Sequence, residues 1–447
     1  MLFSATPAQA AQSRWTRART LRNLAIQSQS NSLRYLHSTW TNANYGYTTV
    51  EVASITEASS TVGETGTIEL LVPPRGFSNS SSDEFNSAIK TFSPSDIATQ
   101  PSVGSTRRQA SAAYATALAL SNGTYNEGRV GVSRAEALRR TVAWINALAL
   151  SHARHEWGSS PQSALWTYYL GAGSQRIWSS LPTCTQELVT QAVAEEADRL
   201  VLTPPPYYRN AAGRIVTPGD SKSEENAWNA TLLFCASRMY GSVDATRAAQ
   251  WEAQGRLYAL TAYTTPNQVG KDARIQGSNI NGDGTIVNHR IIHPDYMATA
   301  GEMQTKYVLT AAWTHTSVAP ECANGMNTVW AAMTKLKFSA RKYKKPGGTI
   351  YRVGKHGVAT SAIYYPQGTD WSKYRMHNMA LMDVTMFSAG NAVGYTWAKA
   401  HLSYLLRMQA RHKNGLTFSR GETRFTEEEQ FVAVCSAEMV ERLALVR

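Results

Sequence analysis

The feature that most constrains the fold is a helical hydrophobic period that runs from about residue 107 to the last residues of the chain. Apolar side chains recur there every three or four positions, which places them on one face of an α-helix. Two segments open with a capping box, formed by Ser133 with Glu136 and by Thr426 with Glu429. The period predicts a mainly α fold with helices over residues 109–121, 133–154, 163–170, 185–200, 223–240, 244–263, 296–315, 324–338, 371–390, 395–412 and 426–446.

The arrangement of these helices is less constrained than their number. Helices of this size, joined as antiparallel hairpins, suit a bundle, a solenoid or a closed α/α toroid. No motif recurs at a fixed period, which disfavours TPR-like and HEAT-like repeats. One segment, residues 347–365, alternates around Gly354 and Gly357 and predicts a short β-hairpin excursion between helices.

The first 106 residues have a mixed pattern, and we expect this N-terminal segment (1–106) to pack on a helical domain of residues 107–447. A polar helix is predicted over residues 14–38, and β-like alternation follows over 47–55 and 65–72. The Ser-, Pro- and Thr-rich residues after 78 predict loop.

The net charge of +12 bears on the partners of the chain, because a basic surface attracts anionic ligands. Nucleic-acid binders usually cluster Lys and Arg, whereas the one tight cluster here is residues 341–345, which we expect to be a solvated helix end. No apolar run approaches the ~20 residues that span a bilayer. The 12 Trp and 21 Tyr mildly favour sugar, whose flat C–H faces stack on aromatic rings, although helix packing accounts for most of them. An acidic polysaccharide is therefore the expected partner, without nucleic acid or membrane.

Two features favour export. Ala8-Gln9-Ala10 matches the small-residue pattern of a signal-peptide cleavage site, although an ordinary Ala-rich N-terminus explains it equally well. The four cysteines are even in number, allow three disulfide pairings and form no C-x-x-C metal spacing. We therefore expect a secreted protein.

Four segments hold polar and aromatic residues at predicted helix starts. The first, residues 155–166, brings together Trp157, Gln162 and Trp166, which suit a sugar subsite or, equally, a core Trp and a helix cap. The second, residues 219–229, places Glu224 and Glu225 at the positive end of a helix. That account leaves Asn226 and Trp228 unexplained, since Asn is a weak helix former one turn inside a helix.

The third segment, residues 281–296, is the most informative. Asn288, His289, Arg290, His293 and Tyr296 fall within nine residues, immediately before a helix. Proline at 294 keeps the preceding residue extended, so the segment is expected to be a fixed loop. An extended H-x-x-x-H without a clear third ligand is a weak metal signal, and no metal is expected.

The fourth segment, residues 370–378, contains Asp370, Trp371 and His377. A carboxylate and a Trp at a helix start, with a His two turns in, are typical of the rim of a binding site. Asp370 as a helix cap and Trp371 as a packed first-turn residue is the equally weighted alternative.

These residues resemble the pattern of the α/α-toroid polysaccharide lyases, namely hyaluronate, chondroitin AC and xanthan lyases. In those enzymes an Asn in a Trp-rich segment precedes a D-G-S-F-x-x-H segment, with a Tyr about two turns beyond the His. Asn226 with Trp228, then the segment 283–289 (DGTIVNH), then Tyr296 follow that order here, although the seven positions from His289 to Tyr296 are fewer. The resemblance implies an incomplete or complete α/α toroid and β-elimination on a uronate-containing polysaccharide.

The resemblance also implies roles for four residues. Asn226, helped by Arg290, would hydrogen-bond the uronate carboxylate and stabilise the charge that develops there. Tyr296 and His289 would divide the roles of base and acid. Tyr296 could fill both if nearby cations lowered its pKa. This chemistry needs neither cofactor nor metal.

Two other functions remain open from the residues alone. A toroid glycoside hydrolase would need two carboxylates ~5–9.5 Å apart, with candidates Asp220, Glu224, Asp295 and Asp370. A non-catalytic protein could use an aromatic cleft only to hold glycan. The pattern sets neither the sugar nor the oligomeric state.

Overall fold

The computed structural model describes residues 7–39, 103–154, 157, 160–370, 372, 374–423 and 428–446. The β-like segments 47–55 and 65–72 lie outside these residues, as does Trp371. Within them the chain is mainly helical, and every helix that the hydrophobic period predicts is present. No helix in this part of the chain is long and apolar enough to cross a bilayer.

Six of the helices contact one another in a closed circuit. Each packs against the next in chain order, and the last packs back on the first. They are α5 (Val103–Ser121), α8 (Ser163–Arg176), α10 (Ser223–Cys235), α12 (Pro294–Trp313), α14 (Met376–Ser388) and α16 (Glu428–Ala444). The helix starts that carry the unusual residues, those of α8, α10 and α12, therefore belong to neighbouring members of one circuit.

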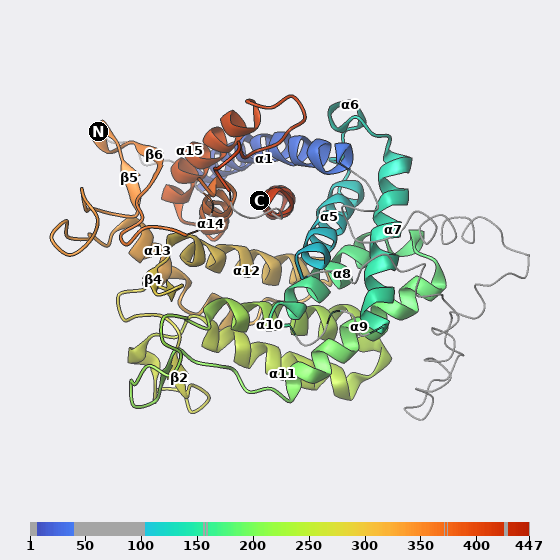
Figure 1. Ribbon diagram of the computed structural model, residues 1–447, viewed down its shortest axis with the longest axis horizontal. Coiled ribbons are helices and arrows are strands. Elements are labelled where there is room, and N and C mark those ends of the chain that lie inside the picture. The colour runs from blue at the N-terminus through green and yellow to red at the C-terminus, as the bar shows by residue number, and fades with distance from the viewer. Residues whose placement is uncertain are drawn as a thin grey trace, which may run out of the picture.

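A second set of helices covers the circuit from outside, one against each member (Figure 1). These are α1 (Pro7–Ser38) on α16, α7 (Arg134–Ala153) on α5, α9 (Thr183–Val201) on α8, α11 (Ala245–Ala262) on α10, α13 (Met326–Thr334) on α12 and α15 (Ala392–Gln409) on α14. Short helical turns connect them: α6 (Glu127–Val130), η3 (Trp178–Ser180), η4 (Ala236–Tyr240), η5 (Gly241–Val243), η6 (Pro266–Gln268), η7 (Pro320–Ala323) and η8 (Lys355–Gly357).

The predicted helix starts are partly confirmed. Ser133 Oγ accepts the Glu136 backbone N–H at 3.2 Å, as a capping residue does. Thr426 of the second predicted capping box lies outside the described residues, and the Glu429 carboxylate accepts the backbone N–H groups of Thr417 and Phe418 at 2.9 Å. It therefore closes the loop between α15 and α16.

Three two-stranded antiparallel sheets lie in the connections. They pair β1 (Arg209–Asn210) with β2 (Gly277–Ser278), β3 (Val287–Asn288) with β4 (Ile291–Ile292), and β5 (Tyr351–Val353) with β6 (Ala359–Ile363). The last pair confirms the predicted hairpin in residues 347–365. The second pair carries the polar motif before α12, which is extended as Pro294 predicted.

One expectation from the sequence is wrong. The basic residues 341–345 do not end a helix, because α13 stops at Thr334 and the cluster lies in the loop that leads to β5. The sequence left the pairing of the cysteines open, and the structure has Cys184, Cys235, Cys322 and Cys435 as free thiols.

The interior of the helix circuit contains a buried ionic cluster. Lys306 Nζ on α12 lies 2.7 Å from Glu302 Oε1 and 3.0 Å from Glu438 Oε1 of α16. Tyr114 of α5 and Tyr169 of α8 donate their hydroxyls to these carboxylates at 3.1 and 3.3 Å. The cluster thus links four helices of the circuit through hydrogen bonds to charged groups, which are stronger than neutral ones.

Candidate functional site

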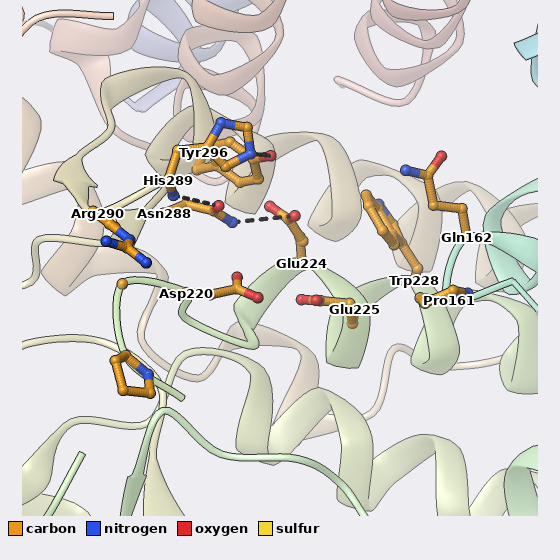
Figure 2. Close-up of a pocket in the computed structure, with 12 residues that line it drawn as sticks. Pro161, Gln162, Asp220, Glu224, Glu225, Trp228, Asn288, His289, Arg290 and Tyr296 are labelled. Atoms are coloured by element: carbon orange, nitrogen blue, oxygen red, sulfur yellow. Dashed lines mark hydrogen bonds between the residues drawn. The ribbon is translucent and has the colours of Figure 1, made fainter. Parts of the chain in front are cut away.

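A pocket of about 360 Å³ opens where the starts of α8, α10 and α12 meet (Figure 2). Twelve residues from these three starts line it: Pro161, Gln162, Pro218, Gly219, Asp220, Glu224, Glu225, Trp228, Asn288, His289, Arg290 and Tyr296. The volume falls within the ~300–1,000 Å³ of small-molecule sites. The pocket combines carboxylates, two amides, an imidazole, a guanidinium, a phenol and an indole.

The loop before α10 is fastened to the β3–β4 hairpin by backbone hydrogen bonds. Ser221 N donates to Val287 O at 2.7 Å, and Arg290 N donates to Gly219 O at 2.8 Å. The carboxylates of α10 and the His289 hairpin are therefore held at a fixed separation on opposite sides of the pocket, as Figure 2 shows.

His289 and Arg290 form the two-residue turn of this hairpin. Both have positive φ, 51° and 67°, where Asn-Gly or Gly is usual. Non-glycine residues in this region carry ~1–3 kcal/mol of strain each and cluster at functional sites. The strained turn places the imidazole of His289 at the pocket.

Gly219 makes room for this turn, and replacing it with alanine tests the fit. A Cβ at Gly219 would lie 2.4 Å from Arg290 Cγ and 3.2 Å from Arg290 Cα, at a φ of +79°. We expect Gly219→Ala to lower the free energy of unfolding by ~1–2 kcal/mol for backbone strain and by a further ~1–3 kcal/mol for overpacking.

Gly213→Ala is the matched control, since Gly213 has a φ of +76° but no described atom within 4 Å of its added Cβ. Denaturant unfolding of both variants separates backbone strain from the steric clash. Equal losses in the two would show that Gly219 does not support the turn.

A hydrogen-bonded chain runs from Asp370 through His289 to Tyr296. Asp370 Oδ2 lies 2.6 Å from His289 Nδ1, and His289 Nε2 lies 3.2 Å from the Tyr296 hydroxyl. Burial acts to raise the pKa of Asp370, but the hydrogen bonds from His289 and His293 outweigh it and hold that pKa below its usual value. In the tautomer whose Nδ1 proton is donated to the ionised Asp370, Nε2 of His289 is the acceptor that faces the Tyr296 hydroxyl.

Behind this chain lies a second imidazole–carboxylate pair. His293 Nε2 is 3.2 Å from Asp370 Oδ1, and His293 Nδ1 is 3.7 Å from Asp295 Oδ2. Burial lowers the pKa of His293 to about 4 and raises the pKa of Asp295 to about 7. Neutral His293 therefore hydrogen-bonds Asp370 from the buried side of the chain Asp370–His289–Tyr296.

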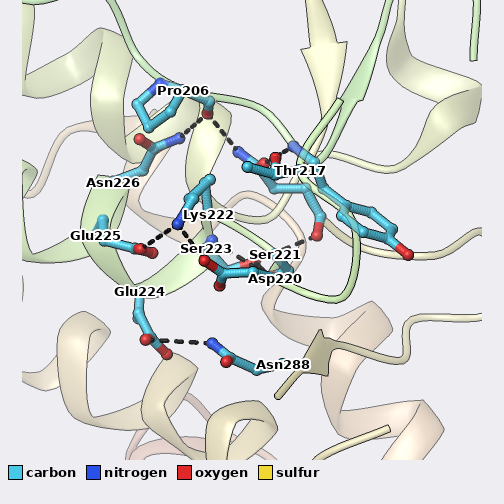
Figure 3. Close-up of polar contacts among 12 residues, drawn as sticks. Pro206, Thr217, Asp220, Ser221, Lys222, Ser223, Glu224, Glu225, Asn226 and Asn288 are labelled. Carbon is cyan, nitrogen blue, oxygen red and sulfur yellow. Dashed lines mark hydrogen bonds and ion pairs between the residues drawn. The ribbon is translucent and has the colours of Figure 1, made fainter. Parts of the chain in front are cut away.

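The carboxylates of α10 form the opposite wall. Glu224 Oε1 accepts from Asn288 Nδ2 at 3.2 Å, whereas no described group hydrogen-bonds the buried Oε2. Burial, then the charge of Glu225, raises the pKa of Glu224 well above its ordinary value. Lys222 contacts Asp220 and lies 2.8 Å from Glu225 (Figure 3). Burial and the neighbouring charge therefore favour the protonated form of Glu224, which lies beside the salt-bridged Lys222.

Tyr296 departs from one expectation. Burial, with Glu224 as the next cause, raises its pKa above the ordinary value of 10.0, although Arg375 and Arg107 act to lower it. Neighbouring cations therefore do not activate Tyr296 as a phenolate, and it can serve as a proton donor.

The structure divides the sequence-predicted site residues into three groups. Gln162, Trp228, His289, Arg290 and Tyr296 line the pocket. Asp370 and His293 join it through hydrogen bonds to the His289 chain. The remaining described residues lie elsewhere: Asn226, Trp157, Trp166 and His377.

Asn226 is the main correction. It is fully buried, and its amide donates to Pro206 O at 3.0 Å and to Thr261 Oγ1 at 3.3 Å. Figure 3 shows it on the side of α10 away from Asn288. Asn226 holds the loop around Pro206 to α10. Beside Glu224 the pocket is lined instead by the amide of Asn288, which the sequence placed in the motif but not in the predicted site.

The other three residues are part of the interior. Trp157 and Trp166 are 5% and 0% exposed, and their rings meet edge to face at 6.0 Å. His377 is fully buried, with Nε2 3.2 Å from Glu428 Oε1. The alternative in which Trp166 belongs to the core is thus confirmed, and a sugar subsite at these three residues is not.

His289, His293 and Asp370 also have the donor atoms that a divalent metal needs. One nitrogen or oxygen from each lies within 4.8 Å of the others. Two imidazoles and a carboxylate are a common zinc donor set. Here the same atoms hydrogen-bond one another, so the cluster can act as a proton relay or, after rearrangement, as a metal site.

Comparison of the chain with protein-family models, with curated proteins and with solved structures gives no match.

Proposed function

We propose that the helix circuit is an α/α toroid and that the chain is a polysaccharide lyase, which cleaves a uronate-containing polysaccharide by β-elimination. The observation that carries the proposal is the pocket itself, where the Asp370–His289–Tyr296 chain faces protonated Glu224 and Asn288. Elimination needs a base together with an acid for the proton transfers, and it needs neutral groups that hydrogen-bond the uronate carboxylate. We propose further that the protein is exported, since such polymers lie outside cells.

Glu224 and Asn288 fit the carboxylate-binding role. A charged carboxylate makes the neighbouring C–H proton weakly acidic, so its charge must be stabilised before that proton leaves. Glu224 and Asn288 both line the pocket, and the carboxyl proton of Glu224 and the second amide hydrogen of Asn288 can donate to it. Preorganised donors of this kind stabilise the transition state, because no reorganisation is needed as the charge develops.

His289 and Tyr296 fit the proton transfers. His289 Nε2 takes the proton from the carbon next to the carboxylate, and Asp370 stabilises the imidazolium that forms. Tyr296, whose raised pKa keeps it protonated, donates to the glycosidic oxygen as the bond between that oxygen and the next ring carbon, the one β to the carboxylate, breaks and a double bond forms between the two carbons. Arg290 supplies positive charge at the rim, and Trp228 offers an apolar face to a sugar ring.

A panel of uronate-containing polysaccharides tests the proposal. A lyase yields products with the ultraviolet absorbance of a conjugated double bond. Reactions with and without a chelator show whether the His289–His293–Asp370 cluster acts through a metal. Absence of absorbing product from the whole panel would contradict the lyase assignment.

Glu224→Gln provides a pH-dependent test. As the pH rises through the raised pKa of Glu224, the parent enzyme acquires a negative charge that repels the uronate, so KM should climb on the alkaline side. Glutamine stays neutral and keeps a donor, so the variant should lose this alkaline rise. Initial rates across the pH range measure it, with Glu225→Gln as the matched control because Glu225 is paired with Lys222. An unchanged alkaline limb in Glu224→Gln would assign the titration to another group.

A glycoside hydrolase is the second candidate, because Asp220, Glu224 and Glu225 all line the pocket. Hydrolysis would use protonated Glu224 as general acid and one of the other carboxylates as base or nucleophile. Asp295 does not line the pocket and accepts the Tyr365 hydroxyl at 2.9 Å. New reducing ends without ultraviolet absorbance would identify this reaction, and binding without products would identify a glycan-binding protein.

A further inference from the structure

The basic charge of the chain is concentrated in one segment. Residues 322–369 contain eight Lys and Arg and no Asp or Glu, so +8 of the net charge of +12 belongs to these residues. Six of the cations lie between α13 and β5: Lys335, Lys337, Arg341, Lys342, Lys344 and Lys345. Arg352 and Lys355 follow in the β5–β6 hairpin. We call these eight side chains the basic loop surface.

The basic loop surface faces solvent without neutralising partners. Seven of its residues are exposed and Arg352 is half-buried. Among the described residues none of the eight forms a salt bridge, whereas other cations such as Arg247, Arg274 and Arg411 pair with carboxylates. Like charges held together without counter-charges repel one another, so such a surface attracts an anionic partner.

The segment that carries this surface is linked to the His289 hairpin by hydrogen bonds. Lys344 N donates to Pro366 O at 2.9 Å, and the Tyr364 hydroxyl donates to Lys344 O. Gln367 then accepts from Ile292 N of the His289 hairpin at 2.6 Å, three residues before Asp370. Figure 1 shows β5 and β6 on the same side of the molecule as β4. A polymer that leaves the pocket on the Asp370 side therefore meets these cations.

An apolar groove lies at the far end of the same segment. It has a volume of about 840 Å³ and runs between α13, the β5–β6 turn and α15. Val353 and Val358 in its walls are 58% and 64% exposed, and Lys335 and Lys399 lie beside them. Apolar walls edged by cations match a chain of sugar rings, which have apolar C–H faces and carboxylates at their edges.

We propose that the basic loop surface and this groove bind the acidic polysaccharide along its length, outside the pocket that cleaves it. The identity of the ligand as a polyuronate rests on the proposed function. The surface raises the affinity for long chains and leaves the turnover of short ones unchanged, because a short chain in the pocket does not reach it.

A loop variant and a charge-matched control test the proposal. The loop variant carries Arg341→Gln, Lys342→Gln, Lys344→Gln and Lys345→Gln. The control carries Arg214→Gln, Lys271→Gln, Lys413→Gln and Arg420→Gln, four exposed cations that form no described salt bridge and lie outside the segment. Both variants change the net charge equally. Circular dichroism and thermal unfolding establish that each is folded.

Binding is measured with fluorescently labelled polygalacturonate and hyaluronate at low and moderate salt. We expect the loop variant to lose at least about tenfold in affinity and the control less than about twofold, with the difference shrinking as salt screens the charges. For whichever polymer is cleaved, KM should rise in the loop variant, while kcat/KM on its shortest cleaved oligosaccharide stays within about twofold.

Equal losses in the two variants would overturn the proposal, because net charge alone would explain the binding. Stronger competition by double-stranded DNA than by polysaccharide of equal charge would overturn it too and assign the surface to nucleic acid. Binding needs no turnover, so a protein that binds polyuronate through the loop but forms no unsaturated product contradicts the lyase assignment alone.

Discussion

Tyr296→Phe is expected to lower the turnover of the cleaved polysaccharide by ~10²-fold or more, the usual cost of removing an acid–base group. The substitution deletes only the hydroxyl that lies 3.2 Å from His289 Nε2. The proton donor to the leaving oxygen is then absent, while the ring still fills its place on α12. Initial rates followed by ultraviolet absorbance measure the effect, and binding of the polymer should change little.

Tyr307→Phe is the matched control for this prediction. Tyr307 lies on the same helix, is also buried, and donates its hydroxyl to Ala227 O at 3.2 Å outside the pocket. Its loss should lower the free energy of unfolding by ~1–3 kcal/mol with turnover retained. His289→Ala should behave like Tyr296→Phe. Full activity in both Tyr296→Phe and His289→Ala would remove the proposed site even if the reaction class were right.

The helices could be predicted from the sequence because the signals are local. Each helix has an apolar stripe and a start or stop residue within its own segment, so periodicity alone locates it to within a few residues. The largest errors lie at α1, which begins seven residues earlier than predicted, at α5, which begins six residues earlier, and at α8, which ends six residues later.

The pocket could be predicted where the motif was compact, as in the run from Asn288 to Tyr296. The assignment of Asn226 failed for a geometric reason. Residues advance by about 100° per position on an α-helix, so Asn226 lies roughly 200° around α10 from Glu224. Trp228 is four residues after Glu224 and therefore lies on the same face of α10, whereas Asn226, two residues after Glu224, does not. The resemblance matched Asn226 by residue type alone. The helix period places Glu224, and not Asn226, on the face of α10 that lines the pocket.

Contacts between distant segments could not be predicted from the sequence. Asp370 is 81 positions from His289, and nothing local indicates that they meet. Lys306 is the clearest case, because Glu302 and Lys306 at i and i+4 look like a solvent-exposed helix pair. Glu438, 132 positions further on, changes that interpretation, since it completes a cluster that is buried in the helix circuit.

Lys306→Met is expected to lower the free energy of unfolding by ~3–5 kcal/mol, a large part of the ~5–15 kcal/mol that stabilises a typical domain. Methionine replaces the volume of the lysine stem but leaves Glu302 and Glu438 buried without a counter-charge. Denaturant unfolding at neutral pH measures the loss. The triple variant Lys306→Met, Glu302→Gln, Glu438→Gln is the control, and it should recover much of the loss because neutral amides need no counter-charge.

The pH dependence of this loss identifies its cause. Burial opposes the charge of Lys306, but Glu302 and Glu438 outweigh it and raise its pKa, so it stays charged. Without Lys306, burial raises the folded-state pKa of both carboxyls above the unfolded value of ~4.3. A raised folded pKa contributes stability that is fully present below the unfolded pKa and is lost as the pH rises through the folded one. The gap between parent and variant should therefore be small near pH ~4 and widen toward pH ~8. A gap that does not change with pH would show that packing, and not unpaired charge, accounts for the role of Lys306.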